Sequence, residues 1–221
     1  MTNIERKQVS VEFMLAEFNA VQTNIVRLEG IKSSRVNFFL VIVAASIAGI
    51  SGLLNNPNLQ MFSSYIFAVA ALALLVLGIA ILNQLVQYSA AIVSLYRRAG
   101  RIRRWFADAD EAIIRYLAFD AGDDIPAFAL NSTYLEFRGG DVIILTINSL
   151  SFAVCVISFV MISHPIFYPF ALLLGIGLAL VAWFVQRNRI LAKLRKIEDY
   201  TKKDIRFPHK DIEANQTVNL K

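Results

Sequence analysis

The chain has 221 residues, of which 57% are hydrophobic and only 18% are charged, and its formal net charge is +5. Soluble domains carry about 25% charged residues, so this composition excludes an intrinsically disordered chain and argues against a soluble globular enzyme. A single cysteine also excludes a disulfide-rich scaffold.

The charged residues are confined to part of the chain. Residues 36–96 form a run of 61 positions without Asp, Glu, Lys or Arg, and residues 142–186 form a second run of 45. A bilayer core of about 30 Å is crossed by about 20 helical residues, so each run is long enough for two spans. We therefore expect an all-α integral membrane protein.

Residues 1–35 predict a cytoplasmic amphipathic helix. Apolar residues recur there at alternating steps of four and three, which is the spacing of a helix that packs one stripe against a partner: Met14, Phe18, Val21, Ile25 and Leu28. The segment is too long and too charged for a cleavable signal peptide, so we expect the span that follows it to be a retained signal anchor.

The first transmembrane hairpin is expected over residues 36–86. Polar turn-formers and a proline at 55–60 would leave backbone groups unpaired in lipid. They divide the run into spans at 36–54 and 64–84.

Residues 87–141 predict a cytoplasmic basic helix followed by a loop. The four-three spacing continues through Ile102, Phe106, Ala109, Ile113 and Tyr116. The loop is marked by turn-forming residues, namely Asp120, Gly122, Asp123, Asp124 and Pro126. Residues 133–137 alternate in polarity and could lie at the membrane interface.

The second transmembrane hairpin is expected over residues 142–186, with spans at 142–162 and 166–183 separated by Ser163, His164 and Pro165. A cytoplasmic helix follows at 187–206, with seam positions at Ile190, Leu194 and Ile197. The tail at 207–221 has no periodicity, and we expect it to be mobile.

Orientation follows from the Lys and Arg residues near the span ends. Five precede the first span, seven lie between the second and third, ten follow the fourth, and none falls in either hairpin turn. Both termini and the central segment are therefore expected on the cytoplasmic side. The predicted fold is four transmembrane helices in two hairpins, with three helices extending into a cytoplasmic helical bundle whose seams pair either within one chain or between subunits.

A basic run at the inner end of the second span is the most charged feature, and it contains Arg97, Arg98, Arg101, Arg103 and Arg104. Such a run can bind anionic lipid headgroups, a nucleotide or an oligonucleotide. It can equally serve as a topology signal of the positive-inside kind. The sequence leaves both interpretations open.

Polar residues inside the spans form a second candidate site: Asn83, Gln84, Gln87, Thr146, Asn148 and Ser151. Buried amides in lipid need partners, so these residues either join helices or line a hydrated pore. No ionisable residue lies within the spans, which argues against a proton-coupled transporter or a voltage sensor.

No sequence motif for catalysis or cofactor binding is present. Phosphate-binding loops, dinucleotide-binding glycine motifs, zinc-protease motifs and nucleophile elbows are all missing. Two histidines and one cysteine cannot build an ordinary zinc site of His and Cys ligands. We expect no enzyme, no catalytic residue, no cofactor and no metal site.

The layout resembles known small bacterial membrane proteins. The resemblance is carried by the stretch Asn24-Ile-Val-Arg-Leu-Glu29, which leads through Arg35 into the first span, and by the basic helix after the second span. It is similar to SLATT-type membrane effectors and to four-span accessory proteins encoded beside some CRISPR effectors. The resemblance implies an oligomeric membrane module that perturbs the envelope when a partner signals, and it transfers no role to any single residue.

These observations lead to a functional hypothesis. We expect an oligomeric protein of the bacterial inner membrane that acts as a gated pore or membrane-perturbing effector in anti-phage defence, controlled through its cytoplasmic stalk. The alternative is a non-conducting scaffold or accessory subunit that anchors a cytosolic partner. Expected partners are membrane lipid, further copies of the chain and a cytosolic protein or nucleotide ligand, while nucleic acid stays an open alternative.

Overall fold

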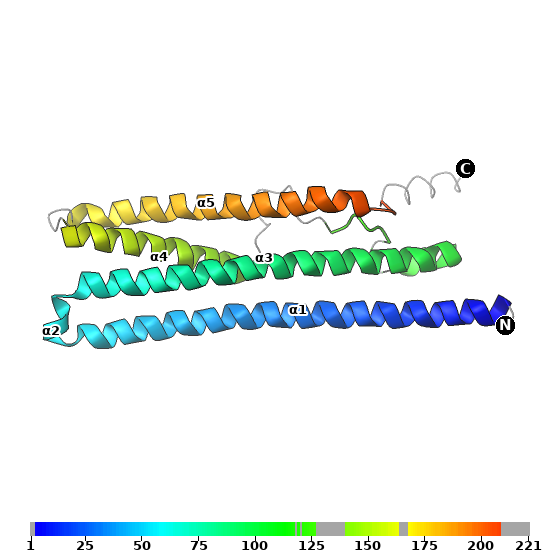
Figure 1. Cartoon of the computed structure of the whole chain (residues 1–221), viewed down its shortest axis with the longest axis horizontal. Helices are drawn as coiled ribbons and strands as arrows, with labels where there is room; N and C mark the ends of the chain where they lie inside the picture. The colour runs from blue at the N-terminus through cyan, green and yellow to red at the C-terminus, as the bar shows by residue number, and fades with distance from the viewer. Residues whose placement is uncertain (1–2, 118, 120, 127–139, 164–167, 209–221) are drawn as a thin grey trace. The chain divides into compact units, whose positions relative to one another are not determined.

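A computed structural model describes residues 3–117, 119, 121–126, 140–163 and 168–208 (Figure 1). Its elements are α1 (Asn3–Leu54), α2 (Pro57–Gln60), α3 (Ser63–Ala109), the 3-10 helix η1 (Glu111–Tyr116), α4 (Gly140–Ser163), α5 (Tyr168–Thr201) and the 3-10 helix η3 (Lys202–Asp204). No strand occurs among the described residues, so the predicted all-α class is confirmed. The alternating stretch 133–137, the turn residues His164 and Pro165 and most of the tail lie outside them.

Three stretches within the described residues are long and apolar enough to cross a membrane. They are Lys7–Leu54, Ser63–Ala109 and Gly140–Ile162, and each contains a window of high mean hydropathy. They include the first three predicted spans. Part of the fourth, residues 166–183, lies outside the described residues, and α5 begins at Tyr168. The helices are thus consistent with a membrane protein.

The predicted break in the first uncharged run is confirmed. Helix α1 ends at Leu54, and the Asn56 side chain accepts a hydrogen bond from the backbone N–H of Asn58 at 3.1 Å. Asn56 thereby caps α2, whose first residue, Pro57, has no N–H to satisfy. Helix α3 then begins at Ser63, so the turn separates the two predicted spans.

The chain forms two compact units. The first unit consists of Met1–Ile31, Tyr88–Leu130 and Leu194–Lys221, and the second consists of Lys32–Gln87 and Asn131–Lys193. Helices α1, α3 and α5 contribute residues to both units. The first unit holds most of the charged residues, whereas both uncharged runs fall largely in the second.

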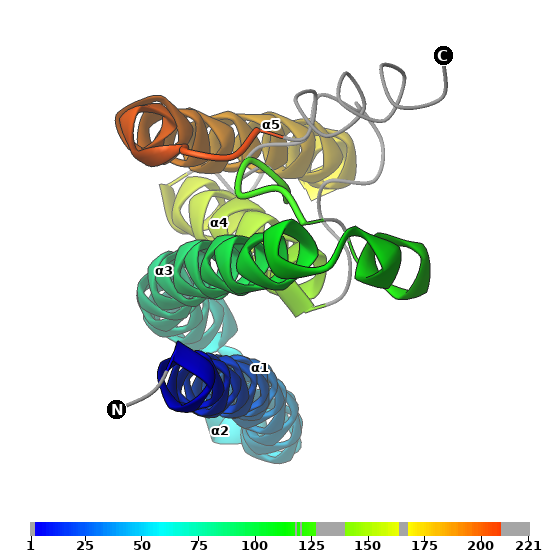
Figure 2. The ribbon, with the colours of Figure 1, turned by 90° about the vertical axis from the view of Figure 1, so that its right-hand side faces the viewer.

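The core of the first unit joins α1 to α3. Val21 and Ile25 of α1 are buried against Ala99 and Ile102 of α3, and further seam residues pack around them, namely Met14, Phe18 and Phe106. In this unit α3 lies between α1 and α5 (Figure 2). The seam predicted before the first span and after the second is therefore confirmed up to Phe106.

Beyond Phe106 the predicted seam is wrong. Helix α3 ends at Ala109, because Asp110 takes an extended conformation and its carboxylate accepts a hydrogen bond from the N–H of Ala112 at 3.0 Å. Asp110 thus caps a new 3-10 helix, η1, and breaks the four-three spacing. Tyr116, at the end of η1, is 85% exposed and takes no part in a core.

The second unit is packed around large side chains of α1, α3 and α4. Phe39, Leu85, Ile144 and Leu145 are completely buried there. Helices approach closely where glycine leaves room: a Cβ at Gly140 would come within 2.4 Å of the side chain of Val36. Lys32 and Asp141 form an ion pair at 2.7 Å between α1 and α4.

The second unit exposes apolar side chains and buries polar ones. More than half of the surface of several large hydrophobic residues is exposed, and these residues lie on four helices: Phe38, Val41, Ile47, Val69, Val76, Leu150, Phe159, Leu173 and Val181. Soluble proteins rarely expose so large an apolar surface. By contrast, Asn148, Ser149, Ser151 and Ser158 are buried. This distribution suits a lipid environment.

Candidate functional site

A loop of the first unit packs directly against α3 at a glycine. The carbonyl oxygen of Gly122 would lie 2.1 Å from a Cβ built on Gly100, so only glycine at position 100 allows the loop to come this close. Both glycines are buried. Residues 121–126, which we call the docking loop, are thereby held beside the arginines that flank Gly100 on α3.

Asp123 anchors the docking loop. Its side chain is completely buried and accepts three hydrogen bonds, from the Arg101 Nε at 2.7 Å, the Phe207 N–H at 2.9 Å and the Arg206 N–H at 3.0 Å. Its own N–H donates to the carbonyl of Phe207 at 3.0 Å. One aspartate thus joins the docking loop to α3 and to the segment that follows η3.

These contacts keep Asp123 ionised. Burial by itself would raise the pKa of this carboxyl group, because it disfavours the charged form. The N–H of Arg206, the guanidinium of Arg101 and the N–H of Phe207 all donate to the carboxylate, and the positive charge of Arg101 adds to their effect. The net result is a pKa of Asp123 below its ordinary value.

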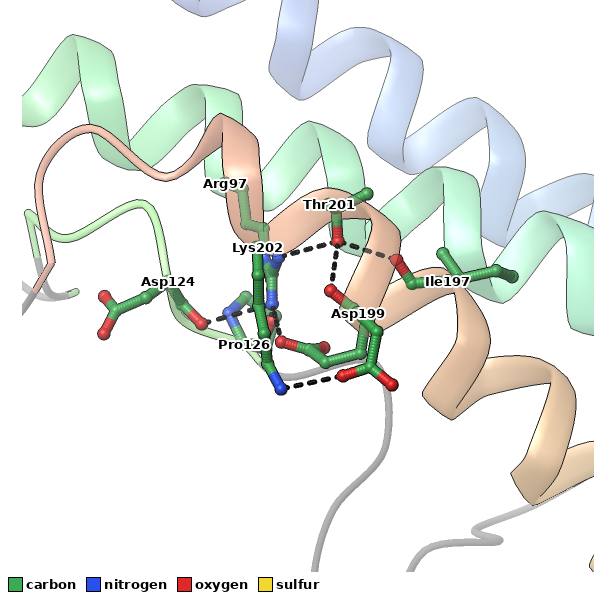
Figure 3. A network of polar contacts seen from close by, with 8 residues as sticks. Arg97, Asp124, Pro126, Ile197, Asp199, Thr201 and Lys202 are labelled. Atoms are coloured by element: carbon green, nitrogen blue, oxygen red, sulfur yellow. Dashed lines mark hydrogen bonds and ion pairs between the residues drawn. The ribbon is translucent and has the colours of Figure 1, made fainter.

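Arg97 makes a second set of contacts between the same segments (Figure 3). It is buried, and its Nη2 pairs with the Glu198 carboxylate at 2.8 Å. The guanidinium also donates to the carbonyls of Asp124 and Pro126 and, at 3.3 Å, to the Thr201 hydroxyl. Arg97 therefore links the docking loop to α5.

The remaining arginines of the basic run differ in their surroundings. Arg103 lies over the Phe18 ring at 5.7 Å and the Phe119 ring at 5.0 Å, and Arg104 pairs with Asp108 at 2.8 Å. Arg98 is exposed. The five residues predicted as one basic site thus divide into three that contact other segments, one that pairs within α3 and one that faces solvent.

The polar residues predicted within the spans also divide. Asn148 and Ser151 are buried in the second unit. The other four are exposed on its surface: Asn83, Gln84, Gln87 and Thr146. Of these, Asn83 accepts a hydrogen bond from the Lys193 Nζ at 2.7 Å. The structure therefore does not bring the six residues together at one place within the described chain.

Asn148 is the unusual member of this set. Its side chain is completely buried in α4, and neither its Oδ1 nor its Nδ2 has a hydrogen-bond partner among the described residues. The amide lies against Gly78 of α3, where an added Cβ would come within 1.7 Å of the Oδ1, and close to the ring of Phe39. An unpaired buried amide costs about 1–3 kcal/mol, so this packing is less stable than one with an apolar side chain at the same position.

Sequence reasoning missed the residues that hold the first unit together. It read Asp123 as a turn-former, and it assigned no role to Glu198, Thr201 or Arg206. The available signal was the run of acidic residues after a basic helix, which suggests ion pairing. That signal does not distinguish Asp123 from Asp124, whose carboxylate lies away from the Arg97 guanidinium in Figure 3 while its carbonyl accepts the bond.

Within the described residues, no group of three or more His, Cys, Asp or Glu side chains is placed to hold a metal ion. Comparison with family models, curated proteins and solved structures finds no match for this chain.

Proposed function

We propose that the chain is an oligomeric membrane protein that acts as a gated pore or membrane-perturbing effector, with the first unit as its regulatory part. In this proposal four spans cross the bacterial inner membrane as two hairpins, and both termini face the cytoplasm. The exposed apolar surface of the second unit supports insertion in lipid. The confinement of all 22 Lys and Arg residues outside the hairpin turns supports the orientation.

The observation that carries the pore is the unpaired amide of Asn148. A scaffold whose spans serve only as an anchor gains nothing from burying an unsatisfied polar side chain at the centre of its packing. In a gated protein, by contrast, the amide would bond to water or to another helix when the packing opens. Asn148 would then raise the free energy of the closed state by about 1–3 kcal/mol and keep it close to that of the open state.

Oligomerisation is supported by exposed polar residues on the apolar unit. Gln84, Gln87 and Thr146 lie on the surface of the second unit. Amide and hydroxyl groups that face lipid are costly, whereas such groups between subunits can bond to each other or line water. These three residues are therefore proposed to face neighbouring copies of the chain.

The test is ion or dye flux through liposomes that contain the purified full chain. Replacing Asn148 by Leu (N148L) removes the unpaired amide, so it should raise the melting temperature and lower the flux by about tenfold, which corresponds to about 1.4 kcal/mol. The matched control is Ser149→Ala, which also removes a buried polar side chain from α4, but one whose hydroxyl already donates to the Leu145 carbonyl at 2.8 Å. Wild-type liposomes that pass nothing, or equal effects of both variants, would contradict the pore.

The scaffold remains a second candidate because of one feature of the first unit. Near its N-terminus α1 exposes apolar side chains, with Val9, Phe13 and Leu15 each more than half exposed. Such a surface suits a cytosolic protein partner as well as a second copy. A Phe13→Cys variant should form a disulfide between copies if the surface joins subunits, since the native Cys155 is buried.

The role in anti-phage defence is supported by the likeness of layout to bacterial membrane effectors. Its test is the plating efficiency of a phage panel on cells that carry the wild-type chain or N148L. Protection that depends on Asn148 would support it, and equal plating on empty and expressing cells would contradict it.

A further inference from the structure

The first unit contains a small cavity whose lining is rich in arginine. Its volume is about 170 Å³, and its walls come from α3, the docking loop, and the end of α5 with the segment after it. The charged residues that line it are Arg97, Arg98, Arg101, Asp123, Asp204 and Arg206. We call this the basic cavity.

The charges around the basic cavity do not balance. Four arginines and two aspartates line it, and Glu198 neutralises Arg97 from outside the lining, so an excess of one positive charge is left. Like charges held this close repel each other unless an anion lies between them. A phosphate or phosphomonoester group carries about −1.5 to −2 charges at neutral pH, so it can offset this excess.

Two of the four arginines already have partners in the chain. Arg97 pairs with Glu198, and Arg101 pairs with Asp123 and donates to the carbonyl of Asp204. The guanidinium groups of Arg98 and Arg206 make no hydrogen bond or ion pair with the other described residues, and both side chains are exposed. These two groups can therefore bind a ligand without first breaking a contact.

Arg98 and Arg206 line the cavity from two different segments, α3 and the segment that follows η3. Arg98 follows the buried Arg97 on α3, and the backbone N–H of Arg206 is bonded to the buried Asp123 carboxylate at 3.0 Å. Ser94, one turn before Arg98, adds a hydroxyl group to the lining. Guanidinium groups bind phosphate oxygens through paired N–H donors, so two arginines and a hydroxyl that line one cavity can together bind a phosphate group.

We propose that the basic cavity binds the phosphate group of a small ligand between Arg98 and Arg206. The ligand is inorganic phosphate or a phosphomonoester, because a 170 Å³ space is smaller than the usual pockets for whole organic ligands. Any larger part of the molecule, such as a nucleoside or a lipid glycerol, would lie outside the cavity. Binding itself does not depend on the proposed pore.

Occupancy of this site would strengthen the docking of the C-terminal segment. The ligand would join α3 to the segment that already bonds to Asp123, so it would add a contact between the same parts of the first unit. If the proposed function holds, phosphate binding is the stimulus that the regulatory part detects. The stronger attachment of the C-terminal segment to α3 is then the structural change that transmits the stimulus.

The test measures binding of inorganic phosphate and of a nucleoside monophosphate to the full chain in zwitterionic nanodiscs by calorimetric titration. We expect R98Q and R206Q each to weaken binding by about tenfold, since hydrogen bonds to charged groups contribute strongly. The affinity should also fall with added salt. The matched control is the double variant R104Q/R195Q, which removes two arginine charges, one from α3 and one from α5, at positions that do not line the basic cavity.

A second measurement distinguishes the source of the phosphate. Trypsin cleavage after Arg206 should slow when the site is occupied, and it is followed in nanodiscs with and without phosphatidic acid. Protection by the soluble ligands supports a soluble source, and protection only by phosphatidic acid supports a lipid headgroup. If no ligand binds or protects, or if R104Q/R195Q weakens binding as much as R98Q or R206Q does, the proposal is wrong. Liposome flux plays no part in either measurement, so failure of the pore leaves this result unaffected.

Discussion

The buried carboxylate of Asp123 gives the sharpest prediction for the first unit. In the variant D123N, the amide oxygen can keep the two bonds that the Oδ2 now accepts, from Arg101 and Arg206. The amide nitrogen then faces the N–H of Phe207, so the third bond is lost and two donors oppose each other. The substitution changes the shape of the side chain very little, so its effect reports charge and hydrogen bonding.

The magnitude follows from these three contacts. Weakening two charge-assisted bonds to neutral ones costs about 1 kcal/mol each, and leaving a buried donor unpaired costs about 1–3 kcal/mol more. Because Arg101 is 36% exposed and partly screened by water, we take the lower end of the range. The expected loss is about 3 kcal/mol, which is roughly a 150-fold increase in the opening of the docking loop.

Hydrogen exchange of the backbone amides of Asp123 and Phe207 in the full chain measures this opening. The control is D108N, because Asp108 is an exposed partner of Arg104 within one helix, where such a pair contributes about 0.3–0.5 kcal/mol. Exchange should rise about 150-fold in D123N and about twofold in D108N. A rise of less than about threefold in D123N, or equal rises in both variants, would refute the assignment of Asp123 as the anchor.

Two further predictions concern the same loop. G100A places a Cβ 2.1 Å from the Gly122 carbonyl oxygen and should lower the free energy of unfolding by about 1–3 kcal/mol. The control G30A meets nothing within 4 Å and should stabilise α1 by about 0.5–1 kcal/mol. Melting temperatures that shift in the same direction for both variants would contradict this. Because the pKa of Asp123 is lower in the folded chain than in the unfolded one, docking should be complete above the ordinary aspartate value of about 3.9 and be lost as the pH falls through the folded value. Hydrogen exchange at Phe207, corrected for its intrinsic rate, measures that loss, and a D123N chain that shows the same acid transition would overturn it.

Patterns that depend on neighbouring residues were readable from the sequence. The break before α3 follows from Asn56 and Pro57, whose preferences act within one turn. The packed stripes of α1 and α3 follow from the spacing of Val21, Ile25 and Ile102, because a repeated stripe has to face a partner, whereas the sequence left open which partner that is. Local chemistry and periodicity were sufficient for both.

The failures came from contacts between distant segments and from one overlooked cap. Asp110 is a residue type that commonly starts a helix, but the prediction extended the four-three spacing past it to Tyr116, which is exposed. The anchor at Asp123 depends on backbone groups more than 80 residues away, which no local pattern encodes. For the same reason the basic run was read as one site, although Arg97 and Arg98 face different surroundings in the fold.

The way Asp123 is held has a consequence for how this segment can change during evolution. The two bonds from residues 206 and 207 come from backbone N–H groups, which every residue except proline supplies. Side chains at these two positions can therefore be exchanged without loss of the anchor, while the aspartate itself cannot. A saturation scan read out by hydrogen exchange of the docked segment should show one intolerant position, 123, and two permissive ones, 206 and 207. Ligand binding through the Arg206 side chain can therefore change while the docking is kept.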